Sequence, residues 1–367
     1  MRTAFAVLLG IHGLIHLLGF LKAFDLATLD QLSLPISRPM GALWGLAALL
    51  MILFALFFGF SLTGYAWALG ALALLLSQFL ILSAWSDARF GTIPNVILLL
   101  LVLGQFGQWR FHRMTEHEIH SLLSGIGPIS EEPLTEDQLH GLPVPVQRWI
   151  QRSGALGKPA IQVARISQNA RMKMRPGQKE WTQANALQYT LTADPAFHWT
   201  VELRYNALLS FRGRDQYIDG HGQMLILMNA LVPVVKASGP QLDEGTMQRY
   251  LGELVWLPSL ATSRYIHWEP LDSLSARATM NYQGVTGSGE FYFNTEGDFV
   301  KYVAQRFQGS GPEARRYPWE ISATETREFG GIRVPSALKA TWKLDEGDWT
   351  WLEMDITGIW YNKEAIP

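Results

Sequence analysis

The feature that most constrains the fold is the near absence of charge from the first 109 of the 367 residues. Only 7 of the 62 Asp, Glu, Lys and Arg residues precede Arg110. This region holds four apolar segments, each close to the length of about 20 residues that a helix needs to cross a bilayer. They are Thr3–Leu21, Gly41–Phe60, Gly64–Trp85 and Thr92–Trp109. The sequence therefore predicts an integral membrane protein with a four-helix transmembrane domain over residues 1–109.

The orientation of this domain stays open. Four spans put the N-terminus and the C-terminal region on the same side of the membrane. Basic residues favour the cytoplasmic side, but each side has three: Arg2, Arg110 and Arg113 on one, and Lys22, Arg38 and Arg89 on the other. The chain has no cysteine, which excludes disulfides and a cysteine nucleophile. Because a free thiol is a liability outside the cytoplasm, this absence favours an extracytoplasmic C-terminal region.

His12 and His16 lie one helical turn apart, well inside the first apolar segment. Ionisable residues at such depth face the interior of a helix bundle and are functional by default. The pair could ligate a metal or haem, or relay a proton. Alternatively, both imidazoles are neutral and hydrogen-bonded to neighbouring helices, with Gln78 and Gln105 as candidate partners. We favour this second interpretation, because the sequence offers no third metal ligand at a similar depth.

Composition and motifs exclude several other functions. The net charge is −2 and there is no run of basic residues, so a nucleic-acid partner is not expected. We expect no cofactor, because no glycine-rich loop follows a strand and opens a helix to hold phosphate groups. The sequence also lacks the Gly-x-Ser-x-Gly turn that presents a nucleophilic serine. Membrane lipids remain the expected partners, and protein partners stay undetermined.

Residues 110–159 connect this domain to the C-terminal region. A juxtamembrane helix is expected from Arg110, followed by a linker rich in Pro, Gly and acidic residues. A short helix then begins near Pro145 and ends near Gly154.

From residue 160 to 367 the apolar residues alternate with period two, which indicates β-strands. Five pairs of turn residues separate several of them: Asp219-Gly220, Gly287-Ser288, Glu296-Gly297, Gly330-Gly331 and Glu346-Gly347. The expected strands are Ile161–Met172, Ala186–Thr192, Phe197–Tyr205, Arg214–Ile218, Gln223–Met228, Tyr265–Glu269, Ser275–Tyr282, Gly289–Asn294, Phe299–Phe307, Trp319–Phe329, Arg333–Lys343 and Trp349–Ile359.

One helix, over residues 243–257, interrupts these strands. Met247, Tyr250, Leu251 and Leu254 fall at helical spacing on one apolar face. Asp243 is expected to cap its N-terminus, and Pro258 marks its end. With a single prominent helix, a parallel α/β fold is excluded. The sequence therefore predicts a mainly antiparallel β domain, a curved sheet or half-barrel on which this helix packs.

Four residues are candidates for ligand binding. Arg249 and Glu253 lie one turn apart on the polar face of the helix, and Trp256 and Trp268 follow it. The domain is also rich in other tryptophans, and a curved sheet whose concave face is not filled leaves an apolar cavity. We expect Arg249 and Glu253 to be partly buried, where they anchor the helix or hold the polar end of an apolar ligand. No catalytic residue is assigned, and His12 and His16 are only weak metal candidates.

Several sequence runs together resemble a bacterial family of membrane-associated proteins. They are LPVPVQRWIQRSGALGK, RYLGELVWLP, WEPLDSLSARATM, GEFYFNTEGD and GIWYN, which extend from Leu142 to Asn362, and the opening HGLIHLLGF. The resemblance implies location in a bacterial cell membrane. The C-terminal region of that family is classed as a domain of unknown function, so the resemblance assigns no activity to this chain. By architecture alone, the β domain is also similar to the periplasmic lipoprotein-carrier half-barrel.

Three functions remain open at this point. The first is a non-enzymatic protein whose β domain binds a lipid or other apolar ligand, with the helix over residues 243–257 as a lid or floor. The second is an enzyme that acts on a membrane-associated substrate through Arg249, Glu253, Asp215 and His221. The third is a membrane assembly or scaffold factor. An apolar cavity favours the first, convergent polar groups the second, and a filled core with a large exposed apolar patch the third.

Overall fold

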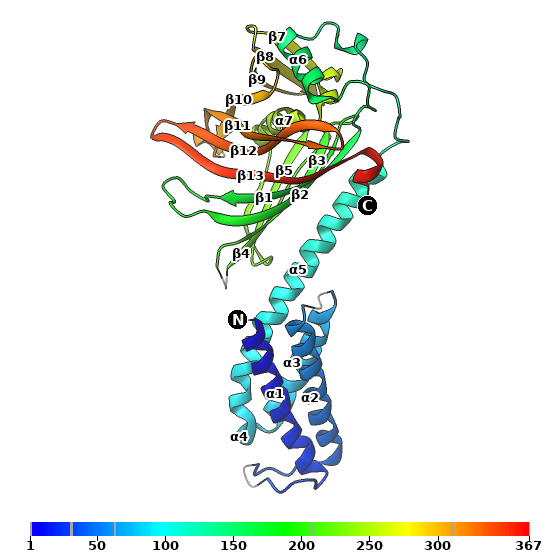
Figure 1. The fold of residues 1–367 in the computed structure, drawn as a ribbon. Coiled ribbons are helices and arrows are strands. Elements are labelled where there is room, and N and C mark those ends of the chain that lie inside the picture. The colour runs from blue at the N-terminus through cyan, green and yellow to red at the C-terminus, as the bar shows by residue number, and fades with distance from the viewer. Residues whose placement is uncertain (1, 30–31, 62–63, 207–208, 310, 367) are drawn as a thin grey trace. The chain divides into compact units, whose positions relative to one another are not determined.

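The computed structural model of the protein describes residues 2–29, 32–61, 64–206, 209–309 and 311–366. The chain divides into two compact units, Met1–Met114 with Asn229–Leu231, and Thr115–Met228 with Val232–Pro367. The first unit is helical and the second consists mainly of strands (Figure 1). The boundary falls within one long helix, α5, whose last turns belong to the second unit.

Long apolar helices make up the first unit. In the described part of the chain, four helices are long and apolar enough to cross a membrane. A short helix and a 3₁₀ turn lie between the third and the last of them. The helices are α1 (Arg2–Ala23), α2 (Arg38–Gly59), α3 (Ala66–Ser83), α4 (Trp85–Ala88) and α5 (Thr92–Ser124).

The described residues of the second unit form one antiparallel sheet of 13 strands. The strands are β1 (Val163–Met172), β2 (Thr182–Leu191), β3 (Ala196–Arg204), β4 (Ser210–Ile218), β5 (His221–Met228), β6 (Val232–Ser238), β7 (Ile266–Pro270), β8 (Ser275–Tyr282), β9 (Val285–Phe293), β10 (Phe299–Gln308), β11 (Arg315–Phe329), β12 (Ile332–Leu344) and β13 (Gly347–Tyr361). Successive strands pair with one another except for β6 and β7, and the first strand, β1, also pairs with the last, β13.

This order places β1 and β13 in the middle of the sheet and leaves β6 and β7 as its two edges. The chain passes from one edge to the other through α7 (Pro240–Glu253). This helix contacts β4 and β5 in one half of the sheet and β9 and β10 in the other. The sheet therefore curves around α7 (Figure 1), and the predicted half-barrel with one prominent helix is confirmed.

Two local features of the sheet differ from the sequence prediction. Strand β6 was not expected, because it contains Pro233, which lacks an amide donor. It lies at the edge of the sheet and pairs with β5 beside an irregularity in register, where a proline is tolerated. The turn between β8 and β9 uses Gln283 and Gly284, both with positive φ, rather than Gly287-Ser288.

Helix α7 also starts earlier than predicted. Pro240 occupies its first turn after Gly239, whose φ is 116°, so the helix begins three residues before Asp243. Asp243 is therefore not the cap. Its carboxylate accepts a hydrogen bond from the backbone N–H of Gly222 in β5, at 2.7 Å, and so ties the helix to the sheet. Beyond Glu253 the chain continues in two 3₁₀ turns, Leu254–Trp256 and Pro258–Thr262.

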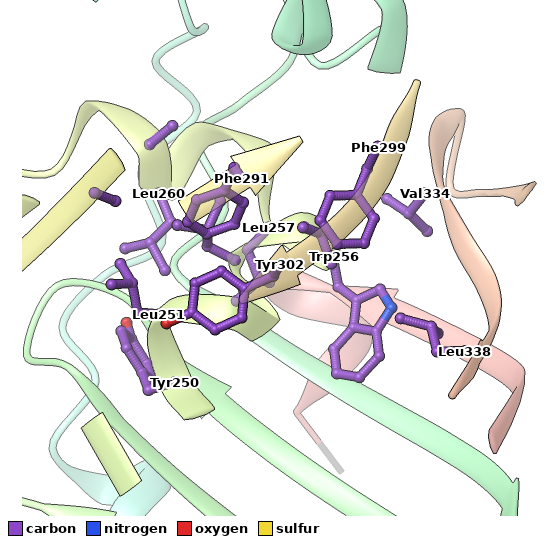
Figure 2. Packing of buried hydrophobic residues seen from close by; sticks show 14 of the residues in the cluster. Tyr250, Leu251, Trp256, Leu257, Leu260, Phe291, Phe299, Tyr302, Val334 and Leu338 are labelled. Carbon is purple, nitrogen blue, oxygen red and sulfur yellow. The ribbon is translucent and has the colours of Figure 1, made fainter. Parts of the chain in front are cut away.

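The core of the second unit lies between α7 and the concave face of the sheet (Figure 2). Tyr302 of β10 is fully buried there against Phe291, with ring centroids 4.7 Å apart. Its hydroxyl donates a hydrogen bond to the backbone oxygen of Gln248 in α7, at 3.0 Å. Tyr250 and Leu251 are buried on the same helix. These contacts fix the rotation of α7 and determine where Arg249 points.

Candidate functional site

A cavity of about 320 Å³ lies in the second unit, on the concave side of the sheet. Strands from both halves of the sheet line it, together with α7 and the 3₁₀ turn that follows the helix. Most of the lining side chains are aliphatic or aromatic, including Val201, Ile226, Ile321 and Leu338. The core therefore does not fill the whole concave face.

A row of tryptophans forms one wall of this cavity. Trp319 of β11 pairs directly with Trp342 of β12, and Trp342 pairs with Trp349 of β13. Because residues that oppose one another in an antiparallel sheet point to the same face, the three indoles lie side by side. All three line the cavity. The row offers a broad apolar surface with few rotatable bonds.

A charged cluster lies at the α7 side of the cavity and is centred on Arg249. Its guanidinium donates hydrogen bonds to Glu253 Oε1 at 2.7 Å and to Asp215 Oδ2 at 2.6 Å. A third bond joins Arg249 to Gln188 Oε1 at 3.0 Å, and Gln188 Nε2 donates to Glu253 Oε2 at 2.6 Å. The guanidinium also lies 4.9 Å from the ring centroid of Trp199. The single positive charge of Arg249 is thus shared between two carboxylates, and apolar side chains surround all three groups.

Burial and mutual repulsion perturb the ionisation of this cluster. Burial raises the pKa of the Asp215 carboxyl, and the nearby Glu253 adds to that rise, while Arg249 opposes it. Burial acts to lower the pKa of the Arg249 guanidinium, but Glu253 and Asp215 outweigh this effect and raise it. Arg249 is therefore held firmly in its charged form, with its two carboxylates as counter-charges.

A second arginine, Arg306 of β10, lines the same cavity. Its guanidinium carbon lies 4.1 Å from the ring centroid of Trp319 and 5.9 Å from that of Trp342. Burial, together with repulsion from Arg249, lowers the pKa of the Arg306 guanidinium to about 10, so it is still charged at neutral pH. Within the described ranges, no carboxylate forms an ion pair with it.

Three of the four candidate ligand-binding residues, Arg249, Glu253 and Trp256, line the cavity. Trp256 is 2% exposed, and its indole N–H donates to the backbone oxygen of Pro335 at 3.0 Å. Trp268 is not among the lining residues. It packs on Phe291 and donates to a backbone oxygen in the 3₁₀ turn before β7, so it belongs to the core.

The polar group of the enzymatic hypothesis is only partly assembled. Asp215 joins Arg249 and Glu253, whereas the side chain of His221 is 71% exposed and lies 3.4 Å from Asp243. The sequence prediction missed Arg306, although the alternation of β10 points to it. Tyr302 and Ala304 are buried on one face of that strand, and Arg306 is the next residue on this face.

His12 and His16 lie in the first unit, in a chain of hydrogen bonds between helices. His12 Nε2 lies 3.1 Å from Asn95 Oδ1 on α5, and His16 Nε2 lies 2.9 Å from Ser77 Oγ on α3. Ser77 in turn donates to Asn95 Oδ1, and Asn95 Nδ2 donates to Gln78 Oε1. The described residues contain no group of three His, Asp or Glu side chains that could hold a metal. Contacts with neighbouring helices account for both imidazoles.

Comparison with known proteins places this domain in a family. Residues 132–354 match the model of a family of unknown function, DUF6544. The chain belongs to the DUF6544 family. The matched region contains α7, most of the strands and the whole lining of the cavity. Membership confirms the resemblance that the sequence runs indicate, and it assigns no activity to the DUF6544 domain.

No curated protein sequence matches the chain. Among solved structures, the chain is similar to a LolA superfamily protein from Nitrosomonas europaea. The two sequences are 11% identical, the TM-score is 0.35, and the match covers 60% of this chain and 94% of the other.

Proposed function

We propose that the DUF6544 domain binds a lipid or another apolar ligand, without enzymatic activity, and that the four apolar helices anchor it in a bacterial cell membrane. The cavity beside α7 is the observation that carries this proposal. Its volume, about 320 Å³, falls at the lower end of the range of about 300–1,000 Å³ that small-molecule pockets occupy.

The lining supports an apolar ligand. The tryptophans at positions 319, 342 and 349 and aliphatic side chains such as Ile226 and Leu338 surround the space. Burying an apolar chain against them removes hydrocarbon from water, which is worth about 0.8 kcal/mol for each methylene. Helix α7 closes one side and is held in place by the Arg249 cluster, so it forms the floor of the cavity.

The polar groups support binding more than catalysis. A general acid or base needs a carboxyl that is free to exchange a proton with the substrate. Asp215 and Glu253 both accept hydrogen bonds from Arg249, and Glu253 accepts another from Gln188, so of their four oxygens only Asp215 Oδ1 has no donor among the described residues. The other candidate base, His221, lies outside the cavity. The cluster is thus better suited to positioning α7 than to proton transfer.

A cavity-filling variant tests the proposal. Ile321 of β11 is half-buried at the edge of the core and lines the cavity, so Ile321→Trp places a large side chain in it. Ser322 is the next residue and points to the opposite face, so Ser322→Trp is the matched control. The full chain is purified in a mild non-ionic detergent, and its bound lipids are identified by mass spectrometry.

We expect a lipid that is retained by the wild type and by Ser322→Trp, and lost from Ile321→Trp. Equal lipid content in all three proteins would show that the retained lipids surround the helices rather than occupy the cavity, and would contradict the proposal.

A further inference from the structure

The charges that line the cavity are unequal in number. Two carboxylates, Asp215 and Glu253, and five cations, Lys173, Arg214, Arg249, Arg306 and Lys339, are among the residues that border the cavity. Arg214 and Lys339 each lie between two lining residues of their strands, so their side chains point to the opposite face of the sheet. Arg249 is paired with both carboxylates. Two other cations are paired with carboxylates that do not line the cavity, Arg214 with Glu118 at 3.2 Å and Lys339 with Glu353 at 3.1 Å.

The other two cations that border the cavity are Lys173 and Arg306. The Lys173 ammonium lies over the ring of Trp181, 4.6 Å from its centroid. Arg306 is the more deeply placed of the two and lies beneath α7. If Gly245 of this helix carried a Cβ atom, that atom would lie 3.3 Å from Arg306 Nη2. Among the residues that the structure describes, neither cation forms an ion pair. Asp215 and Glu253 attract Arg306 only from beyond salt-bridge distance. A buried cation without a directly bonded counter-ion is costly, and an anion that reached it would reduce the cost.

Unpaired hydrogen-bond donors also outnumber acceptors around this space. Arg306 Nε and the indole nitrogens of Trp319, Trp349 and Trp351 are buried and have no acceptor within the described part of the chain. All four residues line the cavity. On the acceptor side of the lining, Asp215 Oδ1 is buried without a donor. An excess of donors favours a ligand that brings acceptor oxygens.

We infer that the ligand is an amphiphile with an anionic head group, a carboxylate or a phosphate, and that Arg306 binds this head group while the apolar chain lies against the tryptophan row. This inference rests on the proposed function and specifies the class of ligand. Arginine suits both head groups, because its planar guanidinium can donate two parallel hydrogen bonds to two oxygens. The rings of Trp319 and Trp342 hold the guanidinium plane in position.

The test uses the full chain in lipid nanodiscs and four radiolabelled probes with the same chain length: dodecanoate, dodecyl phosphate, dodecanol and dodecyltrimethylammonium. Retention by Ile321→Trp in matched discs is subtracted, because it measures partition into the bilayer alone. The variants are Arg306→Met, Arg306→Lys and, as a control, Arg277→Met. Arg277 lies at the surface and is paired with Glu290.

We expect the wild type and Arg277→Met to bind dodecanoate, dodecyl phosphate or both more tightly than dodecanol, and dodecyltrimethylammonium most weakly. Arg306→Met should weaken binding of the anionic probes about tenfold to a hundredfold, the value of a charged hydrogen bond. Dodecanol binding should change less than about threefold, which separates loss of the charge from misfolding. Arg306→Lys should retain part of the preference.

The outcomes separate the two proposals. If dodecanol binds as tightly as both anions, and Arg306→Met changes none of the affinities, the cavity binds apolar chains and the inference about the head group is wrong. If no probe is retained above the Ile321→Trp level, the proposed function fails as well. A preference for only one of the two anions identifies the head group as a carboxylate or as a phosphate.

Discussion

Arg249 on α7 and Asp215 on β4 form an ion pair of 2.6 Å across 34 positions of sequence. The next residue on the helix toward its N-terminus, Gln248, donates through Nε2 to the backbone oxygen of Gln305 on β10, at 3.1 Å. Adjacent residues of α7 thus bind the two opposite halves of the curved sheet. The helix is therefore a brace across the concave face as well as a wall of the cavity.

The Arg249 cluster predicts strong energetic coupling. Arg249→Met alone leaves Asp215 and Glu253 buried without their counter-charge, which should cost roughly 3–5 kcal/mol of unfolding free energy. In a double-mutant cycle with Glu253→Gln, measured by denaturation of the full chain, the coupling should exceed about 1 kcal/mol. The exposed pair Arg277–Glu290 provides the comparison and should give less than about 1 kcal/mol. Coupling below about 0.5 kcal/mol at Arg249 would mean that the two residues act independently.

Gly289 of β9 should not tolerate a side chain. A methyl group there would overlap the ring and the hydroxyl of Tyr302, which is fully buried and hydrogen-bonded to α7 (Figure 2). Gly289→Ala should therefore lower the unfolding free energy by about 1–3 kcal/mol. Gly287→Ala, two residues earlier on the same face, meets flexible side chains of Met247 and Gln248 at 3.1–3.3 Å and should cost less. Equal thermal midpoints for the two variants would contradict this account of the core.

Asp298 predicts a loss of stability in acid. Burial acts to raise the pKa of its carboxyl, but hydrogen bonds from Arg333 at 2.9 Å and Arg152 at 3.2 Å outweigh this effect and hold the pKa below its ordinary value. A lowered pKa in the folded state stabilises the protein above about pH 4. That contribution disappears as the pH falls through the folded pKa.

The thermal midpoint of the full chain at pH 6 and pH 3 tests this dependence. Asp298→Asn should lower the midpoint at pH 6, and the difference from the wild type should shrink at pH 3. Glu325→Gln, which removes an exposed carboxylate, is the control. A difference for Asp298→Asn that stays constant across this range would contradict the prediction.

The four apolar helices predict the membrane topology. Reporter fusions after Ser61 and after Arg113 follow the second and the fourth span, so both should report the same side of the membrane. A fusion after Arg89, between the third and the fourth span, should report the opposite side. If the Ser61 and Arg113 fusions reported opposite sides, an odd number of spans would lie between them, and the prediction of two would be wrong.

His12→Leu and His16→Leu should leave the fold intact. Each removes a hydrogen bond to another helix, at Asn95 or Ser77, and such bonds average about 0.6 kcal/mol in membrane proteins. We expect a small decrease in thermal midpoint for each variant, and no visible absorbance or bound metal in the wild type. A metal or haem that is present in the wild type and lost from the double variant would overturn this interpretation.

The sequence by itself determined the elements of the structure. The apolar runs in the first 109 residues predict long helices. A helix that is surrounded by lipid or by other helices is apolar on all sides, so each segment can be recognised from its own residues. The spacing of Met247, Tyr250, Leu251 and Leu254 predicts a helix with one buried face, and all four side chains are buried. Strand β6 is not predicted from the sequence, because Pro233 is disfavoured in strands. A proline is tolerated there only because β6 lies at the edge of the sheet.

The site was decided by the tertiary structure. Pairing of β1 with β13 and the curvature of the sheet bring Asp215, Arg249 and Arg306 to one cavity from three separate elements. Trp256 and Trp268 are both buried and look alike in sequence, yet only Trp256 borders the cavity. Burial patterns record whether a side chain leaves water. They do not record which distant side chain it meets, because that depends on strand order and curvature rather than on any local period.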